Sequence, residues 1–330
     1  MIFSTARPNR LSHALLIGVV LLTGFATDVP AQGYPGKPIR IIVPLAAGGP
    51  TDVLARSISQ RITDNWGQPV VIDNRPGANT NIGTAAAAKS PPDGYTLLMT
   101  VNNLTINPSV YPALPFDPLK DFATITLFAT SPLILVVHPS VTARSVRELI
   151  ALVKRKPREI FFGSPGNGSA PHLAGELFNT LAGVRMVHVP YKGITTAVTD
   201  LVSGQIALMF PGSPIALPLV KAGRLRALAT TGARRTDAAP ELPTIAEAAL
   251  PGYEVSLWYG LLAPANTPQP LIERLHAEVA RIVALPAIRE QWAALGAEPA
   301  STNPGEFAAF LKQDIVKWQK VVRESGIKLD

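Results

Sequence analysis

The sequence predicts an α/β protein of two lobes, in which mostly parallel sheets are flanked by helices and two strands form a hinge. Short runs rich in Val, Ile and Leu alternate with segments of helical spacing along most of the chain. These runs are apolar on both faces, which is typical of parallel strands covered by helices. Two longer extended segments interrupt the alternation, and they are the candidate hinge.

The N-terminal segment has the features of a secretory signal peptide. Arg7 and Arg10 precede an apolar run over residues 14–22, and Val29-Pro30-Ala31 supplies the small residues needed for cleavage near Ala31. A membrane anchor is the alternative interpretation. Even when stretched to residue 26, however, the run has about 13 residues, fewer than the roughly 18 needed to span a bilayer. We therefore expect the chain to be exported.

Length and composition limit the possible functions. Removing the first 31 of the 330 residues leaves 299, enough for two lobes at about 150 residues each. The absence of cysteine excludes disulfides, lipid-modified cysteine and thiolate metal ligands. The formal net charge is +7, but the densest basic cluster, residues 154–158, lies at the polar end of a predicted helix and lacks interleaved aromatics. We therefore expect no nucleic-acid partner.

Eight short runs have the length and composition of strands. In chain order they are residues 39–43, 70–73, 95–99, 133–138, 160–163, 186–189, 206–210 and 225–230. Helical spacing follows several of them, as in Leu54, Ile58 and Ile62 at intervals of four. Gly204 ends another helical segment at the position that favours glycine. This order of elements indicates parallel strands joined by helices.

The two long extended segments are residues 121–138, interrupted at Ser131-Pro132, and residues 253–263. A lobe that the chain enters once and leaves once would use both segments as connections. We therefore expect lobe 1 to comprise residues 32–127 plus 257–330, and lobe 2 to comprise residues 128–256.

Three helices are predicted near the C-terminus. Residues 268–284, 286–295 and 304–322 each begin with a proline, which suits the first turn of a helix. The last segment has one apolar face, formed by Leu311, Ile315, Trp318 and Val322. We expect this tail to pack against lobe 1.

The loop after the first strand is the strongest candidate site. Residues 39–43 lead into Gly48-Gly49 and then into a helix that begins with Pro50. Free backbone N–H groups and the positive end of the helix dipole would meet there, which suits a carboxylate or a phosphate. The alternative is that the glycines serve only a tight turn. Asp52 falls in the first helical turn, where helix capping is favoured over catalysis.

Other loops should converge on the same edge, because ligands bind at the carboxyl ends of parallel strands. Residues 75–83 form a Gly/Asn-rich loop, and Asn102 follows the third strand. The segment G-S-P-G-N-G-S-A-P-H at 163–172 precedes a helix and could clamp a second side of an anion. Tyr191 and Ser213 lie in two further loops of the same kind.

Enzyme motifs are missing. Residues 163–168 lack the third glycine of a dinucleotide fingerprint, and the chain has no G-K-[ST] and no G-x-S-x-G. Four histidines follow residue 31, and no two are spaced as in H-E-x-x-H. We therefore expect no catalytic residue, no metal and no cofactor, although an α/β fold can host many reactions.

These motifs together resemble one family. The segments Y-P-G-K-P-I-R-I-I-V-P, A-A-G-G-P-T-D, G-Q-P-V-V-I-D-N-R-P-G-A, P-D-G-Y-T-L-L, H-V-P-Y-K-G and L-P-G-Y-E-V-S, with the signal peptide, closely resemble the Bug family of extracytoplasmic solute receptors. This family is also called TctC, the substrate-binding proteins of tripartite tricarboxylate transporters. The resemblance covers nearly all of the chain after the signal peptide.

The resemblance implies a two-lobed periplasmic binding protein of the type II-like fold. It implies a receptor, not an enzyme, that closes on a small carboxylate in the periplasm, and we expect the receptor to be a monomer. Membrane transporter subunits, or a sensor kinase in some members, would be its partners. A periplasmic enzyme acting on a small acid remains the alternative.

Combining the resemblance with the loops above, we expect the following ligand-binding residues: Leu45, Ala46, Ala47, Gly48, Gly49, Thr51, Asn102, Ser164, Gly166, Asn167, Gly168, Ser169, His172, Tyr191 and Ser213. One departure from the family pattern bears on the ligand. Where many relatives have an acidic residue and an amide, this chain has Pro211-Gly212-Ser213. An acidic group there could pair with a ligand amine, so we expect a plain or hydroxylated carboxylic acid instead of an amino acid.

Overall fold

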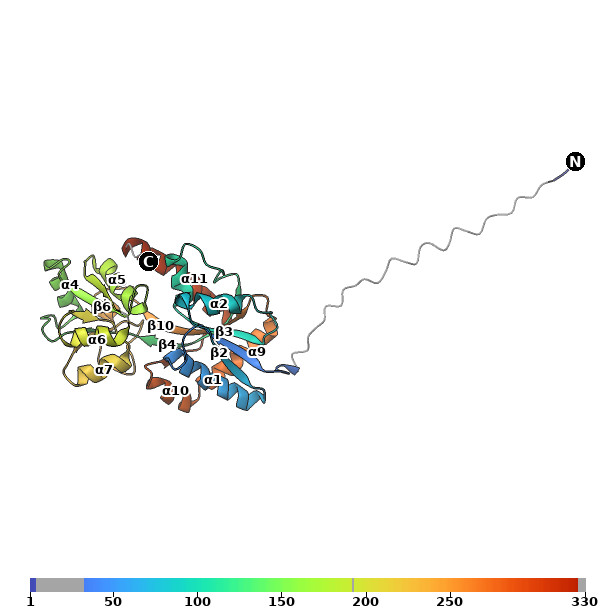
Figure 1. The fold of residues 1–330 in the computed structure, drawn as a ribbon, viewed down its shortest axis with the longest axis horizontal. Coiled ribbons are helices and arrows are strands. Elements are labelled where there is room, and N and C mark those ends of the chain that lie inside the picture. Colours follow the sequence, from blue (N-terminus) through green and yellow to red (C-terminus); the bar gives the residue numbers. More distant parts are fainter. Residues whose placement is uncertain (4–32, 192, 326–330) are drawn as a thin grey trace. The chain divides into compact units, whose positions relative to one another are not determined.

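The computed structural model describes residues 1–3, 33–191 and 193–325. The expected signal peptide and its cleavage site near Ala31 therefore lie almost wholly outside the described residues. All the elements named below belong to the compact unit that begins at Pro35 (Figure 1). Among the described helices, none combines the length and apolar character that crossing a membrane requires.

The first part of this unit is built on a six-stranded sheet with the order β11-β4-β10-β3-β1-β2. Its strands are β1 (Ile39–Val43), β2 (Val70–Asn74), β3 (Thr96–Val101), β4 (Phe122–Pro132), β10 (Ser256–Pro264) and β11 (Glu298–Pro299). Strand β1 is parallel to β2 and β3, whereas β10 is antiparallel to β3 and β4. The carboxyl ends of β1, β2 and β3 therefore lie at one edge, where the loops after them meet.

Seven helical segments accompany this sheet among the described residues. They are α1 (Pro50–Trp66), the 3₁₀ turn η2 (Ala78–Thr80), α2 (Asn81–Ala88), α3 (Asn103–Val110), α9 (Gln269–Val283), α10 (Pro286–Ala293) and α11 (Pro304–Ser325). Helix α1 begins with Pro50 and ends at Trp66, and the next residue, Gly67, has a φ of 70°, which suits glycine. Pro50 therefore marks the start of α1, as the sequence predicts.

The second part is built on a five-stranded sheet with the order β7-β6-β8-β5-β9. Its strands are β5 (Ile134–Val137), β6 (Phe161–Ser164), β7 (Val187–Pro190), β8 (Leu208–Met209) and β9 (Arg226–Thr230). Its helices are α4 (Val146–Arg155), α5 (Ala170–Ala182), α6 (Ile194–Val202), α7 (Ser213–Lys221) and α8 (Ile245–Ala248). In Figure 1 this group of elements lies to the left of β4 and β10.

The predicted α/β class is confirmed, but the sheets are mixed and not mostly parallel. Strand β6 is parallel to β7 and β8, whereas β5 is antiparallel to both β8 and β9. The physical reason is that β5 and β10 carry the chain from one sheet into the other. Strand β10 runs against β3 and β4, and β5 runs against β8 and β9.

The two long extended segments are neighbours in the structure. Strand β4 pairs antiparallel with β10, from the pair Ser256 and Pro132 to the pair Pro264 and Phe122. Strand β4 continues into β5 of the second sheet after one residue, and the chain returns to the first sheet at β10. The paired strands β4 and β10 are thus the place where the chain crosses between sheets.

The predicted apolar face of α11 is confirmed, since Leu311, Ile315, Trp318 and Val322 are all buried. The expectation that this helix packs against the first part alone is wrong, because α11 contributes to two cores. Leu311 lies in the core of the six-stranded sheet, whereas Trp318 and Val322 lie in the core that contains Phe178 of α5. At 22 residues, α11 is about 33 Å long, which is enough to reach both cores.

Candidate functional site

A cavity of about 600 Å³ lies between the two sheets. The six-stranded part contributes residues from α1, η2, α3, β4, β10 and the segment after α10: Pro50, Asn79, Asn103, Ser131, Leu257, Tyr259, Ala294 and Leu295. The five-stranded part contributes Leu133, Pro165, Gly166, Asn167, Ser169, Ala170, Pro171, Ile194, Gly212, Pro214 and Ile215. The first turns of α1 and α5 both reach this cavity, which we call the cleft.

Asp52 organises the turn between β1 and α1. Its carboxylate accepts hydrogen bonds from the backbone N–H of Gly48 at 2.9 Å, from Arg56 Nε at 2.9 Å and from Asn74 Nδ2 at 3.0 Å. Burial raises the pKa of Asp52, but these hydrogen bonds outweigh burial and lower its pKa below the ordinary value. The carboxylate therefore stays charged and holds the turn, in which Gly48 has a φ of 85°.

Ser169 organises the loop between β6 and α5. It is the N-cap of α5, where its Oγ accepts from the backbone N–H of His172 and donates to the carbonyl of Gly166 at 2.7 Å. Gly166 and Gly168 have φ values of 142° and 72°, which glycine adopts without strain. The exposed Asn167 lies between them, at the point of the loop that lines the cleft.

Two stacked imidazoles support the same loop. The rings of His172 and His188 are 3.7 Å apart between centroids, with 13° between their planes. The backbone N–H of Gly168 donates to His172 Nδ1 at 3.0 Å, and His188 Nε2 lies 2.6 Å from Ser164 Oγ. Burial lowers the pKa of His172 to about 3, with a further contribution from His188, and burial lowers the pKa of His188 to about 4. Both rings are therefore neutral near pH 7.

The structure brings three of the expected binding residues to the lining of the cleft: Gly166, Asn167 and Ser169. The other expected residues do not line it: Leu45, Ala46, Ala47, Gly48, Gly49, Thr51, Asn102, Ser164, Gly168, His172, Tyr191 and Ser213. Leu45 to Thr51 flank Pro50, which does line it. The direct ligand roles of all fifteen residues remain predictions.

Several of the expected residues have inward-facing contacts. Asn102 Nδ2 donates to the carbonyl of Ser256 at 2.9 Å, and Asn102 Oδ1 accepts from the backbone N–H of Trp258 at 2.9 Å. Tyr191 donates from its hydroxyl to Asp200 at 2.8 Å, and Ser213 is 3% exposed. Ser164 and His172 are also buried. Of these side chains, Asn102 thus connects the end of β3 to β10.

Sequence reasoning missed the apolar part of the lining. Leu257 and Tyr259 lie two residues apart on β10, so their side chains point to the same face of the strand. Leu133 follows β4, and Ile215 lies in the first turns of α7. The apolar character of β10 is visible in the sequence, but which of its two faces meets the cleft is not.

Asn79 and Asn103 belong to loops that the sequence singled out, although neither was named as a binding residue. Asn103 Nδ2 donates to Asn79 Oδ1 at 2.6 Å, and Asn79 Nδ2 donates to Asn107 Oδ1 at 2.8 Å. Residues 78–80 all have positive φ, from 44° to 78°, which is uncommon for residues other than glycine. A strained segment held by an amide network thus forms one wall of the cleft.

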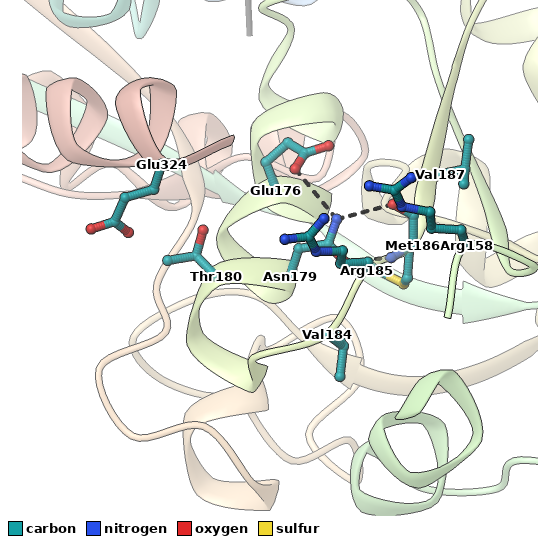
Figure 2. A pocket seen from close by; sticks show the side chains of 9 residues that line it. All are labelled: Arg158, Glu176, Asn179, Thr180, Val184, Arg185, Met186, Val187 and Glu324. Carbon is teal, nitrogen blue, oxygen red and sulfur yellow. Dashed lines mark hydrogen bonds between the residues drawn. The ribbon is translucent and has the colours of Figure 1, made fainter. Parts of the chain in front are cut away.

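A second cavity of about 550 Å³ lies at the other end of α5. Figure 2 shows its lining, in which Asn179 donates to Glu176 and to the carbonyl of Met186. Arg158, Arg185 and Glu324 also line it. Two arginines are thus balanced by two glutamates, so this cavity has no evident preference for an anion.

Among the described residues, no group of three or more His, Asp or Glu side chains could hold a metal ion. Asp52, His172 and His188 are titratable groups in or beside the loops of the cleft. Each is already bonded or stacked within the protein.

Comparison with known proteins gives consistent matches over almost the whole chain. The sequence model of the tripartite tricarboxylate transporter family receptor, TctC, matches residues 54–327. Protein BugT of Bordetella pertussis is 38% identical over 317 residues, covering 95% of this chain and 97% of BugT.

Comparison with solved structures agrees with the family match. The R. palustris protein Rpa4515, solved with adipate, is 37% identical with a TM-score of 0.75, over 89% of this chain and 99% of that protein. The periplasmic binding protein BugD is 32% identical with a TM-score of 0.71, over 89% of this chain and 99% of BugD. The fold of this chain is therefore that of periplasmic binding proteins.

Proposed function

Because the chain belongs to the TctC, or Bug, family of tripartite tricarboxylate transporter receptors, we propose that it is a periplasmic receptor for a small carboxylate. It captures the acid between the two sheets and delivers it to a membrane transporter of the tripartite type. The observation that carries the proposal is the cleft, to which the N-terminal turns of α1 and α5 both contribute. Helix N-termini favour an anion through free N–H groups and the helix dipole.

The carboxylate is held by backbone groups of residues 45–51 and by the loop of residues 166–169. Support comes from the way each loop is pre-organised, by Asp52 on one side and by Ser169 with His172 on the other. A loop that is already in its binding conformation loses less conformational entropy when the ligand binds. Ser164 and His172 are thus positioning residues in this proposal.

The protein binds and releases its ligand without chemical change. A general acid or base must reach the reacting atoms, whereas Asp52 and His172 are each 3% exposed and bonded to backbone N–H groups. The hydrogen bonds of Asp52 and His172 favour a structural role for both side chains.

Ligand capture involves closure about β4 and β10, which we propose as the hinge between lobe 1 (residues 32–127 plus 257–330) and lobe 2 (residues 128–256). The support is that both strands lie where the chain passes between sheets. Closure is favoured only by contacts that the ligand gains in the closed form.

A thermal-shift screen with mono- and dicarboxylates, amino acids and uncharged sugars tests the proposal. Ligand at about 100 times Kd should stabilise the protein by about 2.7 kcal/mol. Asn167→Ala should weaken binding and leave the unliganded melting temperature unchanged, whereas the control Gln205→Ala should alter neither. Stabilisation by uncharged sugars alone would refute a carboxylate receptor.

Two further measurements address turnover and delivery. The ligand recovered after long incubation should be chemically unchanged, and any product would indicate an enzyme. Deleting the gene that encodes this chain from its host should abolish uptake of the acid. Unchanged uptake would argue against delivery to a transporter.

A further inference from the structure

Helix α5 reaches both the cleft and the second cavity. Its N-cap, Ser169, lines the cleft, whereas Glu176 and Asn179 line the second cavity (Figure 2). The buried His172 lies between these two ends. His172, Glu176 and Asn179 are spaced by four and then three residues, so their side chains lie on one face of the helix. A row of polar side chains therefore runs along α5 from one cavity towards the other.

A hydrogen bond at the cleft end of this row fixes the tautomer of His172. The backbone N–H of Gly168 donates to His172 Nδ1 at 3.0 Å, so Nδ1 carries no proton. Burial, with a further contribution from His188, lowers the pKa of His172 to about 3, so the ring is neutral near pH 7 and its single proton lies on Nε2. Among the described residues, the polar group recorded beside Nε2 is Oε1 of Glu176, 3.8 Å away. The ring N–H and the carboxyl of Glu176 are thus neighbours.

The carboxyl of Glu176 is itself held in place. Its Oε2 accepts a hydrogen bond from Asn179 Nδ2 at 3.3 Å. Asn179 is fixed in turn by Met186, whose backbone N–H donates to Asn179 Oδ1 at 2.8 Å and whose carbonyl accepts from Nδ2 at 3.2 Å. The distance of 3.8 Å between Glu176 and His172 is too long for a hydrogen bond, so their attraction is electrostatic. Because the side chain of Glu176 is only 14% exposed, water screens this attraction weakly.

We propose that Glu176 is a positioning residue for the cleft and that it acts through His172. Its carboxyl attracts the N–H at Nε2, which keeps Nδ1 turned towards Gly168 and makes Nδ1 a stronger acceptor. The loop of residues 166–169 is thereby held in the conformation that lines the cleft before any ligand binds. The inference rests on the proposed function, because this loop is one of the two that hold the carboxylate there. One wall of the second cavity thus supports a loop of the cleft.

Amide hydrogen exchange on the full chain without ligand tests this role. In Glu176→Leu the amide of Gly168 should exchange about 10-fold faster, because its acceptor ring is held less firmly. Glu176→Gln keeps an oxygen that can accept from Nε2, so exchange in that variant should stay within about 3-fold of the parent chain. Glu324→Leu is the matched control. Glu324 is an exposed residue of α11 that lines the same cavity, and its replacement should leave exchange at Gly168 unchanged.

A second amide separates positioning of the loop from general weakening of the helix. The backbone N–H of Leu173 donates to the carbonyl of Ser169 in the first turn of α5, and its exchange should not change in Glu176→Leu. A nitrogen NMR spectrum of the parent chain near pH 7 should also show the proton of His172 on Nε2. Equal acceleration at Gly168 and Leu173, no acceleration at Gly168, or a proton on Nδ1 would overturn the inference. Because these measurements use no ligand, such a result would leave the proposed receptor function intact.

Discussion

Thr105 of α3 donates a hydrogen bond of 2.7 Å to Asp314 of α11, and both side chains are buried. Trp258 of β10 donates to the same carboxylate oxygen at 3.2 Å, and Lys317 lies 2.7 Å from the other oxygen. One carboxylate thus joins the C-terminal helix to the strand pair that crosses between the sheets.

Thr105→Val should therefore destabilise the protein by about 1.5 to 3 kcal/mol, because a buried carboxylate loses one donor. Thr196→Val, at an exposed position, is the matched control and should change the free energy of unfolding by less than about 0.5 kcal/mol. Urea denaturation measures both. Equal effects of the two variants would show that the Asp314 network contributes little.

The histidine stack makes stability depend on pH. In the unfolded chain these histidines take up protons below about pH 6.5, whereas in the folded protein they do so only near pH 4 and pH 3. The free energy of unfolding should therefore fall as the pH decreases from about 6.5 towards 4, with no contribution from the pair above pH 7. Melting temperatures across this range should show a shallower slope in His188→Gln. Identical slopes would contradict the lowered pKa values.

Ser169 and Asn167 should separate stability from binding. Ser169→Ala removes the N-cap of α5 and should lower the free energy of unfolding by about 1 kcal/mol. Asn167→Ala should leave it unchanged, because the structure records no hydrogen bond for this exposed side chain. Chemical denaturation without ligand makes the comparison. A larger loss in Asn167→Ala would show that Asn167 has a structural role.

Asp52→Asn should loosen the turn between β1 and α1. The variant weakens the hydrogen bonds from Gly48 and Arg56, and a loss of about 1 to 3 kcal/mol is expected. Asp64→Asn, on the exposed side of the same helix, is the control. Ligand affinity should also fall in Asp52→Asn, as measured by calorimetry. An unchanged affinity would show that this turn does not contribute to the site.

Trp318→Ala tests whether α11 supports both cores. Deleting a fully buried tryptophan should cost about 3 to 5 kcal/mol. Val316, on the opposite side of the helix and 65% exposed, can be replaced by alanine with little effect. Denaturation curves of both variants provide the measurement. A small loss for Trp318→Ala would mean that the second core does not depend on α11.

Much of the local structure could be predicted because it depends on short-range signals. Pro50 starts α1, and the spacing from Leu311 to Val322 defines the buried face of α11. The glycine-rich segment at 163–172 predicts a loop that leads into a helix, and Gly166, Asn167 and Ser169 line the cleft. Each of these follows from residue type and spacing within a few positions.

Side-chain direction in the loops could not be predicted in the same way. Ser164 and His172 are polar residues in a candidate site, yet both face inward, where His188 and the backbone of Gly168 are their partners. Asn102 likewise bonds to β10, more than 150 residues away. Whether a polar loop residue binds a ligand or the backbone depends on which of the two the folded structure places next to it.

The sequence by itself determined the elements, their order and the loops that approach the cleft, because helix and strand periods and turn residues act locally. Only the tertiary structure decided that the sheets are mixed, that α11 reaches both cores, and that Leu257 and Tyr259 face the cleft. These features depend on pairing between segments far apart in the chain. A local pattern shows that a face will be buried, but the partner that covers it is chosen by the packing of the whole molecule.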